Sequence, residues 1–143
     1  MAPQNWPGVT LLRIASLYLV TSLVLGAVMA ATHNHALVSV HSHIGLLGWA
    51  TLALTGLAYL VVPGLAASRL TTVHFWLHNA GLPVMVISLA ALALTGDSRA
   101  EPLIGLGSVL VLGGLVAFTI NAWQNAQSPR ASESTARKSA MTS

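Results

Sequence analysis

Four long runs of apolar residues alternate with short polar segments along this chain. The runs cover about 10–32, 38–62, 71–95 and 102–122. A helix that crosses the roughly 30 Å core of a bilayer needs about 20 mostly apolar residues, and each run reaches that length. The apolar residues are continuous within each run, whereas the strands of a membrane barrel are shorter and alternate apolar with polar positions. The pattern therefore predicts an all-α integral membrane protein, a bundle of four transmembrane helices.

Residues that favour turns separate the four runs. Pro7-Gly8 precedes the first run, Pro63-Gly64 follows the second, and Gly96-Asp97 lies between the third and the fourth. Beyond the fourth run, the segment 124–143 is rich in Ser, Ala and charge, so it has little apolar surface to bury. We therefore expect one four-helix transmembrane domain at 1–123 and a disordered cytoplasmic tail at 124–143.

The few charged residues predict the orientation in the membrane. Only 6% of the residues are charged and 55% are hydrophobic, proportions that a soluble domain of this length does not normally show. Basic residues favour cytoplasmic loops, and four spans put Arg13, Arg69 and the basic tail on one side, with Arg99 alone on the other. The basic residues of the tail are Arg130, Arg137 and Lys138. We expect a bacterial inner-membrane protein with both termini in the cytoplasm.

The sequence pI of about 10.2 follows from this topology and from the basic tail. The expected surroundings are the lipid bilayer, and nucleic acid is not an expected partner. Chemistry is concentrated in histidine, because the chain has six histidines, three acidic residues and no cysteine. A metal bound here would therefore have nitrogen or oxygen ligands. Four histidines gather at the outer, periplasmic end of the first two spans and two open the third span: His33, His35, His41 and His43, then His74 and His78.

His41 and His43 open the second span two residues apart. In a helix they point about 200° away from each other and differ in height by only about 3 Å. They cannot share one ligand, and each ring faces its own space beside the helix. Gly45 and Gly48 follow and leave a flat surface, which suits either a planar macrocycle or close contact with another helix. The spacing fits two haem ligands, and it also fits histidines that only form hydrogen bonds near the membrane interface.

The segment His41-Ser-His43-Ile-Gly45-Leu-Leu-Gly48-Trp49, continuing through Gly56 and Tyr59 to Pro63, resembles the tenth helix of subunit I of C-type haem-copper oxidases. It is similar to the same helix of the nitric oxide reductase large subunit. The segment Val73-His74-Phe75-Trp76, with Gly81, resembles the start of the next helix in those subunits. The membrane part of the chain as a whole resembles the last four helices of that twelve-helix subunit.

The resemblance implies that His41 and His43 are axial haem ligands on opposite faces of one helix, with Gly45, Gly48 and Trp49 lining the haem pocket. The family's other haem ligand and its three copper-ligating histidines come from earlier helices that have no counterpart here. The family's subunit is built as three arcs of four helices. We therefore expect a homotrimer that mimics it, in which one copy's His43 and another copy's His41 ligate a single haem b.

Three functions follow from these features. The first is a haem b protein for electron transfer, with a redox partner, or for response to a gas such as O2 or NO. The second is a non-haem accessory, assembly or copper-handling subunit. The third is an oxidase or nitric oxide reductase, which would make the chain an oxidoreductase. If only one helix histidine binds the haem iron, His33 and His35 are candidate copper ligands.

His74 and His78 lie four residues apart and share one face of the third span. This spacing can bind a metal. The favoured interpretation is different, because Trp76 beside them is typical of the membrane interface, where such side chains anchor a helix or bond to the backbone. Tyr59 is likewise expected to serve packing.

Overall fold

The computed structural model describes residues 6–62 and 64–126, and within them the protein is all-α. Its elements are α1 (Trp6–Thr32), α2 (Val38–His43), the π-helical segment η1 (Ile44–Thr51), α3 (Leu52–Val61), the short 3-10 turn η2 (Leu65–Ala67), α4 (Arg69–Thr95), a second 3-10 turn η3 (Ser98–Ala100) and α5 (Glu101–Asn125). Because α2, η1 and α3 run on without a break, the elements make four long helices, each long and apolar enough to cross a membrane. The prediction of an integral membrane protein with four transmembrane helices is confirmed at this level.

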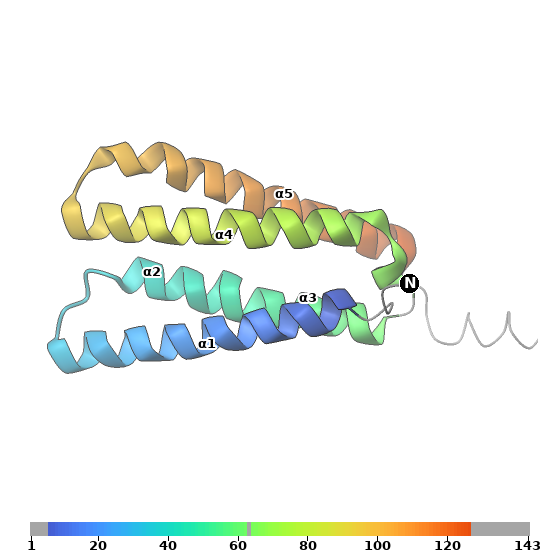
Figure 1. Cartoon of the computed structure of the whole chain (residues 1–143), viewed down its shortest axis with the longest axis horizontal. Helices are drawn as coiled ribbons and strands as arrows, with labels where there is room; N and C mark the ends of the chain where they lie inside the picture. Colours follow the sequence, from blue (N-terminus) through green and yellow to red (C-terminus); the bar gives the residue numbers. More distant parts are fainter. Residues whose placement is uncertain (1–5, 63, 127–143) are drawn as a thin grey trace, which may run out of the picture.

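The four helices form two hairpins that lie side by side (Figure 1). In the first hairpin, α1 packs along η1 and α3, and in the second, α4 packs along α5. The loops inside the hairpins, around residues 33–37 and 96–100, lie at the same end of the bundle. The start of α1, the η2 turn and the end of α5 lie together at the opposite end, as four antiparallel spans require (Figure 1).

Turn residues end the helices close to the predicted positions. Gly96 closes α4 with a left-handed φ of 69°, which glycine adopts without a steric penalty. Ser68 caps the start of α4, where its hydroxyl accepts from the Leu70 amide at 3.2 Å. Three helices are longer than predicted: α1 begins at Trp6, α4 begins at Arg69, and α5 continues to Asn125. The first two residues of the predicted tail are therefore helical. The rest of that tail, 127–143, lies outside the described residues.

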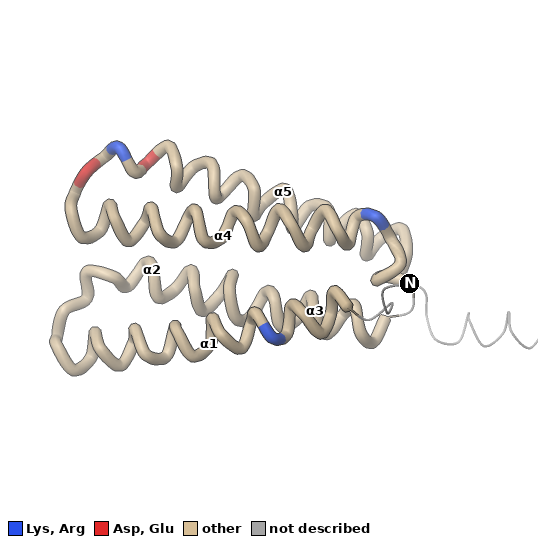
Figure 2. The backbone as a smooth tube through the Cα atoms, viewed as in Figure 1, with Lys and Arg blue, Asp and Glu red and all other residues tan. Residues whose placement is uncertain are grey.

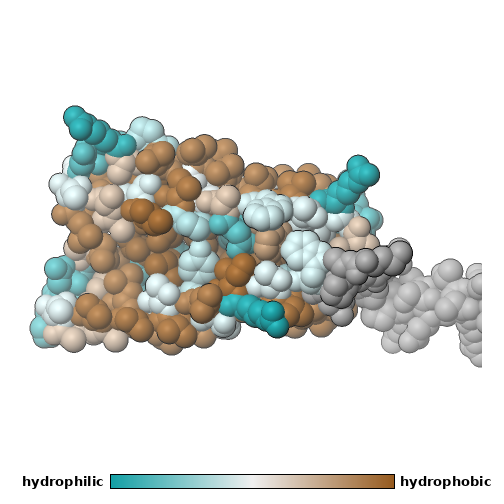
Figure 3. Space-filling model, in the orientation of Figure 1, coloured by the Kyte–Doolittle hydropathy of each residue, from teal (hydrophilic) through white to brown (hydrophobic). Residues whose placement is uncertain are grey.

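Brown, apolar side chains cover much of the face shown in Figure 3, with pale and teal patches among them, and teal side chains project at both ends of the bundle. Asp97, Arg99 and Glu101 mark the loop end, and Arg69 marks the other end (Figure 2). Arg13 is exposed on the side of α1, from where its long side chain can reach toward the nearer end. The basic residues Arg130, Arg137 and Lys138 lie outside the described residues.

The two hairpins differ in how closely their helices approach. In the second hairpin, a Cβ added at Gly107 would lie 2.5 Å from the Met85 backbone nitrogen and 2.7 Å from the Gly81 carbonyl oxygen. In the first hairpin, a Cβ at Gly48 would lie 2.6 Å from Cγ of the Tyr18 side chain. Backbones therefore touch at Gly107 in the second hairpin, whereas the Tyr18 side chain fills the space beside Gly48 in the first. In the first hairpin the backbones meet nearer the start of α1, where a Cβ at Gly8 would lie 2.7 Å from the Gly56 carbonyl oxygen.

The second span is not the regular helix that its sequence predicts. Directly after His43 the backbone widens into the π-helix Ile44–Thr51 before returning to α-helix. The Thr51 hydroxyl donates to the Leu46 carbonyl at 2.8 Å, and the Leu47 carbonyl accepts from His78 of α4 at 3.1 Å. Side chains thus satisfy two carbonyls in the widened segment. Single turns of π-helix inside α-helices are frequent at functional sites.

Candidate functional site

His41 lies in the contact between α2 and α1. Its Nδ1 is 3.0 Å from the Ser22 carbonyl oxygen and 3.2 Å from the Ser22 hydroxyl, and that hydroxyl in turn lies 3.4 Å from the His41 carbonyl. A Cβ added at Gly26 would lie 3.0 Å from Cε1 of the ring, so this glycine makes room for the imidazole. Contacts of Ser22 with both the ring and the backbone carbonyl of His41 therefore hold this residue against α1.

His43 faces a different neighbour, as its spacing from His41 predicts. Its Nδ1 lies 2.7 Å from the Ser39 carbonyl, one helical turn earlier. The ring borders a cavity of about 230 Å³ between the second span and the second hairpin, lined also by Leu47, Met85, Ser108 and Val111 among others. A second hollow of about 210 Å³ beside Ser42 and Leu46 adjoins the same ring. The lining is almost wholly apolar.

The hydrogen bonds of His41 and His43 decide where their protons are. A carbonyl oxygen only accepts, so Nδ1 of His43 donates to the Ser39 carbonyl, and Nδ1 of His41 donates to the Ser22 carbonyl in the tautomer that carries its hydrogen there. In a neutral imidazole, Nε2 then holds the lone pair that a metal requires. Histidines that ligate metals usually donate their other ring N–H to a carbonyl or carboxylate in this way, which fixes the orientation of the ring. Both histidines thus have the tautomer and the support of a metal ligand.

Two of the three residues expected to line a haem pocket face α1, and the third is exposed. A Cβ at Gly45 would lie 3.2 Å from the Ser22 hydroxyl, and Gly48 packs against Tyr18, so both glycines face α1. Of the two interpretations of these glycines, contact between helices is the one observed within the chain. Trp49 is 36% exposed and lies on the outside of the bundle.

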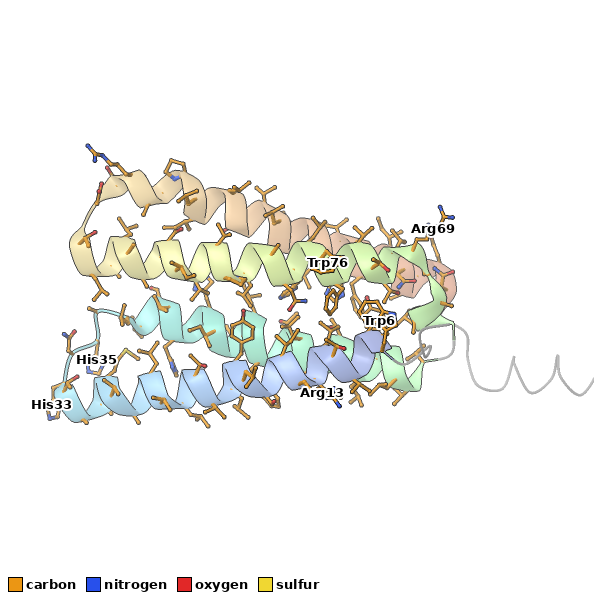
Figure 4. The ribbon with its side chains drawn as sticks, in the orientation of Figure 1. Trp6, Arg13, His33, His35, Arg69 and Trp76 are labelled. Carbon is orange, nitrogen blue, oxygen red and sulfur yellow. The ribbon has the colours of Figure 1, made fainter. Side chains whose placement is uncertain are left out.

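The loop histidines His33 and His35 are exposed at the end of the bundle where the hairpin loops lie (Figure 4). His33 has a left-handed φ of 52°, and the Asn34 side chain accepts from the Ala36 amide at 3.0 Å, which shapes a tight turn. In residues 6–62 and 64–126, no three His, Asp or Glu side chains come together as a metal-binding group. The structure therefore does not bring the loop histidines together with His41 and His43 in such a group.

His74 and His78 are fully buried, which corrects their expected place at the membrane interface. Their ring centroids are 5.5 Å apart. Nδ1 of His74 lies 2.9 Å from the Tyr59 hydroxyl, and Nε2 of His78 donates to the Leu47 carbonyl at 3.1 Å. A hydrogen bond to the backbone was one of the expected roles of these histidines. His78 makes such a bond, to the Leu47 carbonyl, but inside the bundle. Trp76 is 64% exposed and points outward (Figure 4).

Sequence reasoning missed the partners of these histidines. Tyr59, expected only to pack, is 2% exposed and bonds to His74 across the two hairpins. Nothing in the local sequence links residues fifteen positions apart on separate helices. The partner of His43 is different, because the Ser39 carbonyl could have been found from the sequence. Within a helix, a side chain can reach the carbonyl of the residue four positions earlier.

Comparisons of the chain with protein-family models, with curated proteins and with solved structures give no match.

Proposed function

We propose that this chain is a haem b-binding membrane protein in which His41 and His43 are axial ligands. The observation that carries the proposal is the shared hydrogen bonding of the two rings. Each donates Nδ1–H to a main-chain carbonyl, of Ser22 for His41 and of Ser39 for His43, and so keeps the Nε2 lone pair for iron. The sequence resemblance of residues 41–63 and 73–81 to haem-copper oxidase subunit I supports the same assignment.

The surroundings of His43 fit one edge of a porphyrin. The groove beside the ring is lined by Leu47, Met85, Val111 and other apolar side chains, and the Ser108 hydroxyl is its main polar group. Pockets that enclose a small ligand measure roughly 300–1,000 Å³, and the cavity of about 230 Å³ is smaller. One chain therefore covers only part of a macrocycle, and the rest needs a second surface.

A second copy of the chain is the partner that we propose. In a closed ring of identical copies each interface is heterologous, so one face of the second span meets a different face of its neighbour. His41 and His43 lie on different faces and meet α1 and the groove respectively. Three copies with one shared haem at each interface would reproduce the twelve-helix arrangement of the oxidase subunit.

Two imidazoles on one haem iron fill both axial positions, which suits one-electron transfer and leaves no position for a gas. Ser22 and Ser39 orient the ligands, and the apolar groove keeps water from the iron. The loop end of the bundle, which carries Arg99, faces the periplasm in this proposal, and both termini face the cytoplasm. A redox partner would deliver or receive the electron at the periplasmic side, where His41 and His43 lie.

Purified protein in detergent tests the proposal. We expect a pyridine haemochrome spectrum of haem b with a stoichiometric haem content, and a low-spin spectrum that hardly responds to carbon monoxide. In His41→Ala and His43→Ala the haem content should fall more than about tenfold, because an axial bond is lost. His35→Ala is the matched control and should keep its haem.

Different results would favour the other functions. A colourless wild-type protein overturns the haem proposal and leaves a non-haem accessory subunit. A reduced protein that binds carbon monoxide indicates five-coordinate iron and an open site for a gas, as in an oxidase or reductase.

A further inference from the structure

The most unusual buried group in the protein is the pair His74 and His78 inside the bundle. Both side chains are 0% exposed. Each ring has one nitrogen bonded, His74 Nδ1 to Tyr59 and His78 Nε2 to Leu47. The other two nitrogens, His74 Nε2 and His78 Nδ1, are buried and have no hydrogen-bond partner among residues 6–62 and 64–126. A buried polar atom without a partner costs about 1–3 kcal/mol, so two such atoms on adjacent turns indicate that a bound species satisfies them.

From these two unpartnered nitrogens we infer that His74 and His78 bind a single copper(I) ion inside the bundle. Residues four apart on a helix lie on one face, and these rings are close, with centroids 5.5 Å apart. Nitrogen ligands stand about 2 Å from a metal of this size, so one ion that joins both rings requires the two unpartnered nitrogens to come within about 4 Å of each other.

The bonded nitrogens supply the support that a metal ligand needs. His78 must carry its proton on Nε2, because the Leu47 carbonyl only accepts, and its Nδ1 therefore has the lone pair. His74 has the matching tautomer when Nδ1–H donates to the Tyr59 oxygen, which leaves a lone pair on Nε2. A carbonyl and a hydroxyl thus orient the two ligands, as outer partners do in protein metal sites.

The ligand set distinguishes copper(I) from the commoner metals. Zinc in structural sites takes four ligands, and in residues 6–62 and 64–126 no group of three or more His, Cys, Asp or Glu is present. Within the described part of the chain the acids are Asp97 and Glu101, beside the turn between α4 and α5 at the opposite end of the bundle, so neither of them would compensate the two charges of a divalent ion in the core (Figure 2). Copper(I) carries one charge, is well served by imidazole and accepts as few as two ligands.

The neighbouring side chains hold this pair in place. The rings of Tyr59 and Phe118 lie 5.7 and 5.4 Å from the His74 ring. A Cβ added at Gly114 would lie 3.1 Å from the His78 backbone nitrogen, so α5 approaches closely at this point. The site is therefore closed, and copper bound there should exchange slowly.

The experiment measures copper and haem separately in the same protein. Cells are grown with added copper, and the protein is purified in detergent without oxygen and dialysed against a copper(I) chelator. We expect equimolar copper by mass spectrometry, and X-ray absorption with a copper(I) edge and two nitrogen neighbours at about 2 Å. Wild-type protein without copper, or with zinc in its place, overturns the proposal and leaves an ordered water as the species between the rings.

Variants locate the metal. His74→Leu/His78→Leu removes both unpartnered nitrogens together and should abolish copper binding, and His33→Ala/His35→Ala should leave it unchanged. Copper retained in the first variant, or lost in the second, overturns the assignment. If the first variant does not fold, X-ray absorption of the wild-type protein decides whether a copper(I) site with two nitrogen ligands is present. Haem without copper contradicts only this inference, and copper without haem contradicts only the proposed function.

Discussion

The two histidine pairs in the transmembrane helices differ in spacing and in every consequence of that spacing. His41 and His43 are two residues apart, so their rings diverge, one against α1 and the other beside a groove. His74 and His78 are four residues apart, so their rings share one face and their centroids are 5.5 Å apart. The packing of the bundle buries both rings fully. The spacing of two residues thus directs His41 and His43 toward two different spaces. The spacing of four residues lets His74 and His78 face one common space.

The pairs also differ in which parts of the bundle they join. His41 and His43 bond to carbonyls of Ser22 and Ser39, which belong to their own hairpin. His74 and His78 of the second hairpin bond to Tyr59 and Leu47 of the first. The hydrogen bonds of His41 and His43 therefore stay within the first hairpin, whereas those of His74 and His78 join the two hairpins.

The largest effect on stability is expected in the second hairpin, where α4 and α5 touch through their backbones. In Gly107→Ala the new Cβ would meet the Met85 nitrogen at 2.5 Å, and backbone atoms cannot move aside as a side chain can. We expect a loss of about 3 kcal/mol in the free energy of unfolding. Unfolding in mixed detergent micelles measures it.

Gly105→Ala is the matched control on the same helix, because a Cβ there meets nothing within 4 Å. It should be neutral or stabilise the protein by up to about 1 kcal/mol through its helix propensity. Equal effects of the two substitutions would contradict the backbone contact.

The next largest effect tests the bond between the hairpins. Tyr59→Phe removes the hydroxyl that pairs with buried His74 and leaves Nδ1 without a partner. The expected loss is about 2 kcal/mol, since an unsatisfied buried group costs its full desolvation. Stability measured in Tyr59→Phe, His74→Leu and the double variant gives the coupling energy, and additive losses would show that the pair is not coupled.

A smaller effect is expected within the first hairpin. Ser22→Ala removes the hydroxyl beside His41 but keeps the Ser22 carbonyl that accepts from the ring. We expect a loss of about 1 kcal/mol in stability. Because the ring keeps its main support, the haem content should stay close to that of the wild-type protein. A loss of haem as large as in His41→Ala would show that the hydroxyl, and not the carbonyl, orients the ring.

The smallest effect concerns the loop at the end of the first hairpin. His33 has a φ of 52°, which glycine adopts without strain. His33→Gly should raise the free energy of unfolding by less than about 1 kcal/mol, which a slightly higher melting temperature would show. The gain is small because glycine relieves the strained φ but also gains conformational freedom in the unfolded chain. A marked loss of stability would indicate that the imidazole makes a contact that matters.

Much of the fold could be predicted from the chain alone. The apolar runs predict four spans because the thickness of the bilayer sets their length, and Gly96-Asp97 marks the end of α4 because glycine tolerates the left-handed turn. The divergence of His41 and His43 follows from helical periodicity. The haem they are proposed to bind, and the trimer, stay predictions.

The burial of His74 and His78 could not be predicted in the same way. Helices that are apolar on all sides carry no amphipathic stripe, so their sequence does not show which face lies inside the bundle. Trp76 made the interface the natural expectation for its neighbours, and it is indeed exposed, but the two histidines face the opposite way. The π-helix at Ile44–Thr51 was missed for a related reason, since its carbonyls depend on partners from elsewhere, such as His78.

The number of spans, their approximate ends and the directions of histidines within one helix follow from the amino-acid sequence, because they depend on chain geometry and on the solvent. The side chains that meet between helices are known from the packing of the folded chain. Tyr59 bonds to His74, Leu47 to His78, and Gly107 touches the backbone of Met85. Those contacts depend on how four nearly uniform apolar helix surfaces pack against one another. Close contact between small residues and hydrogen bonds of buried polar atoms determine that packing.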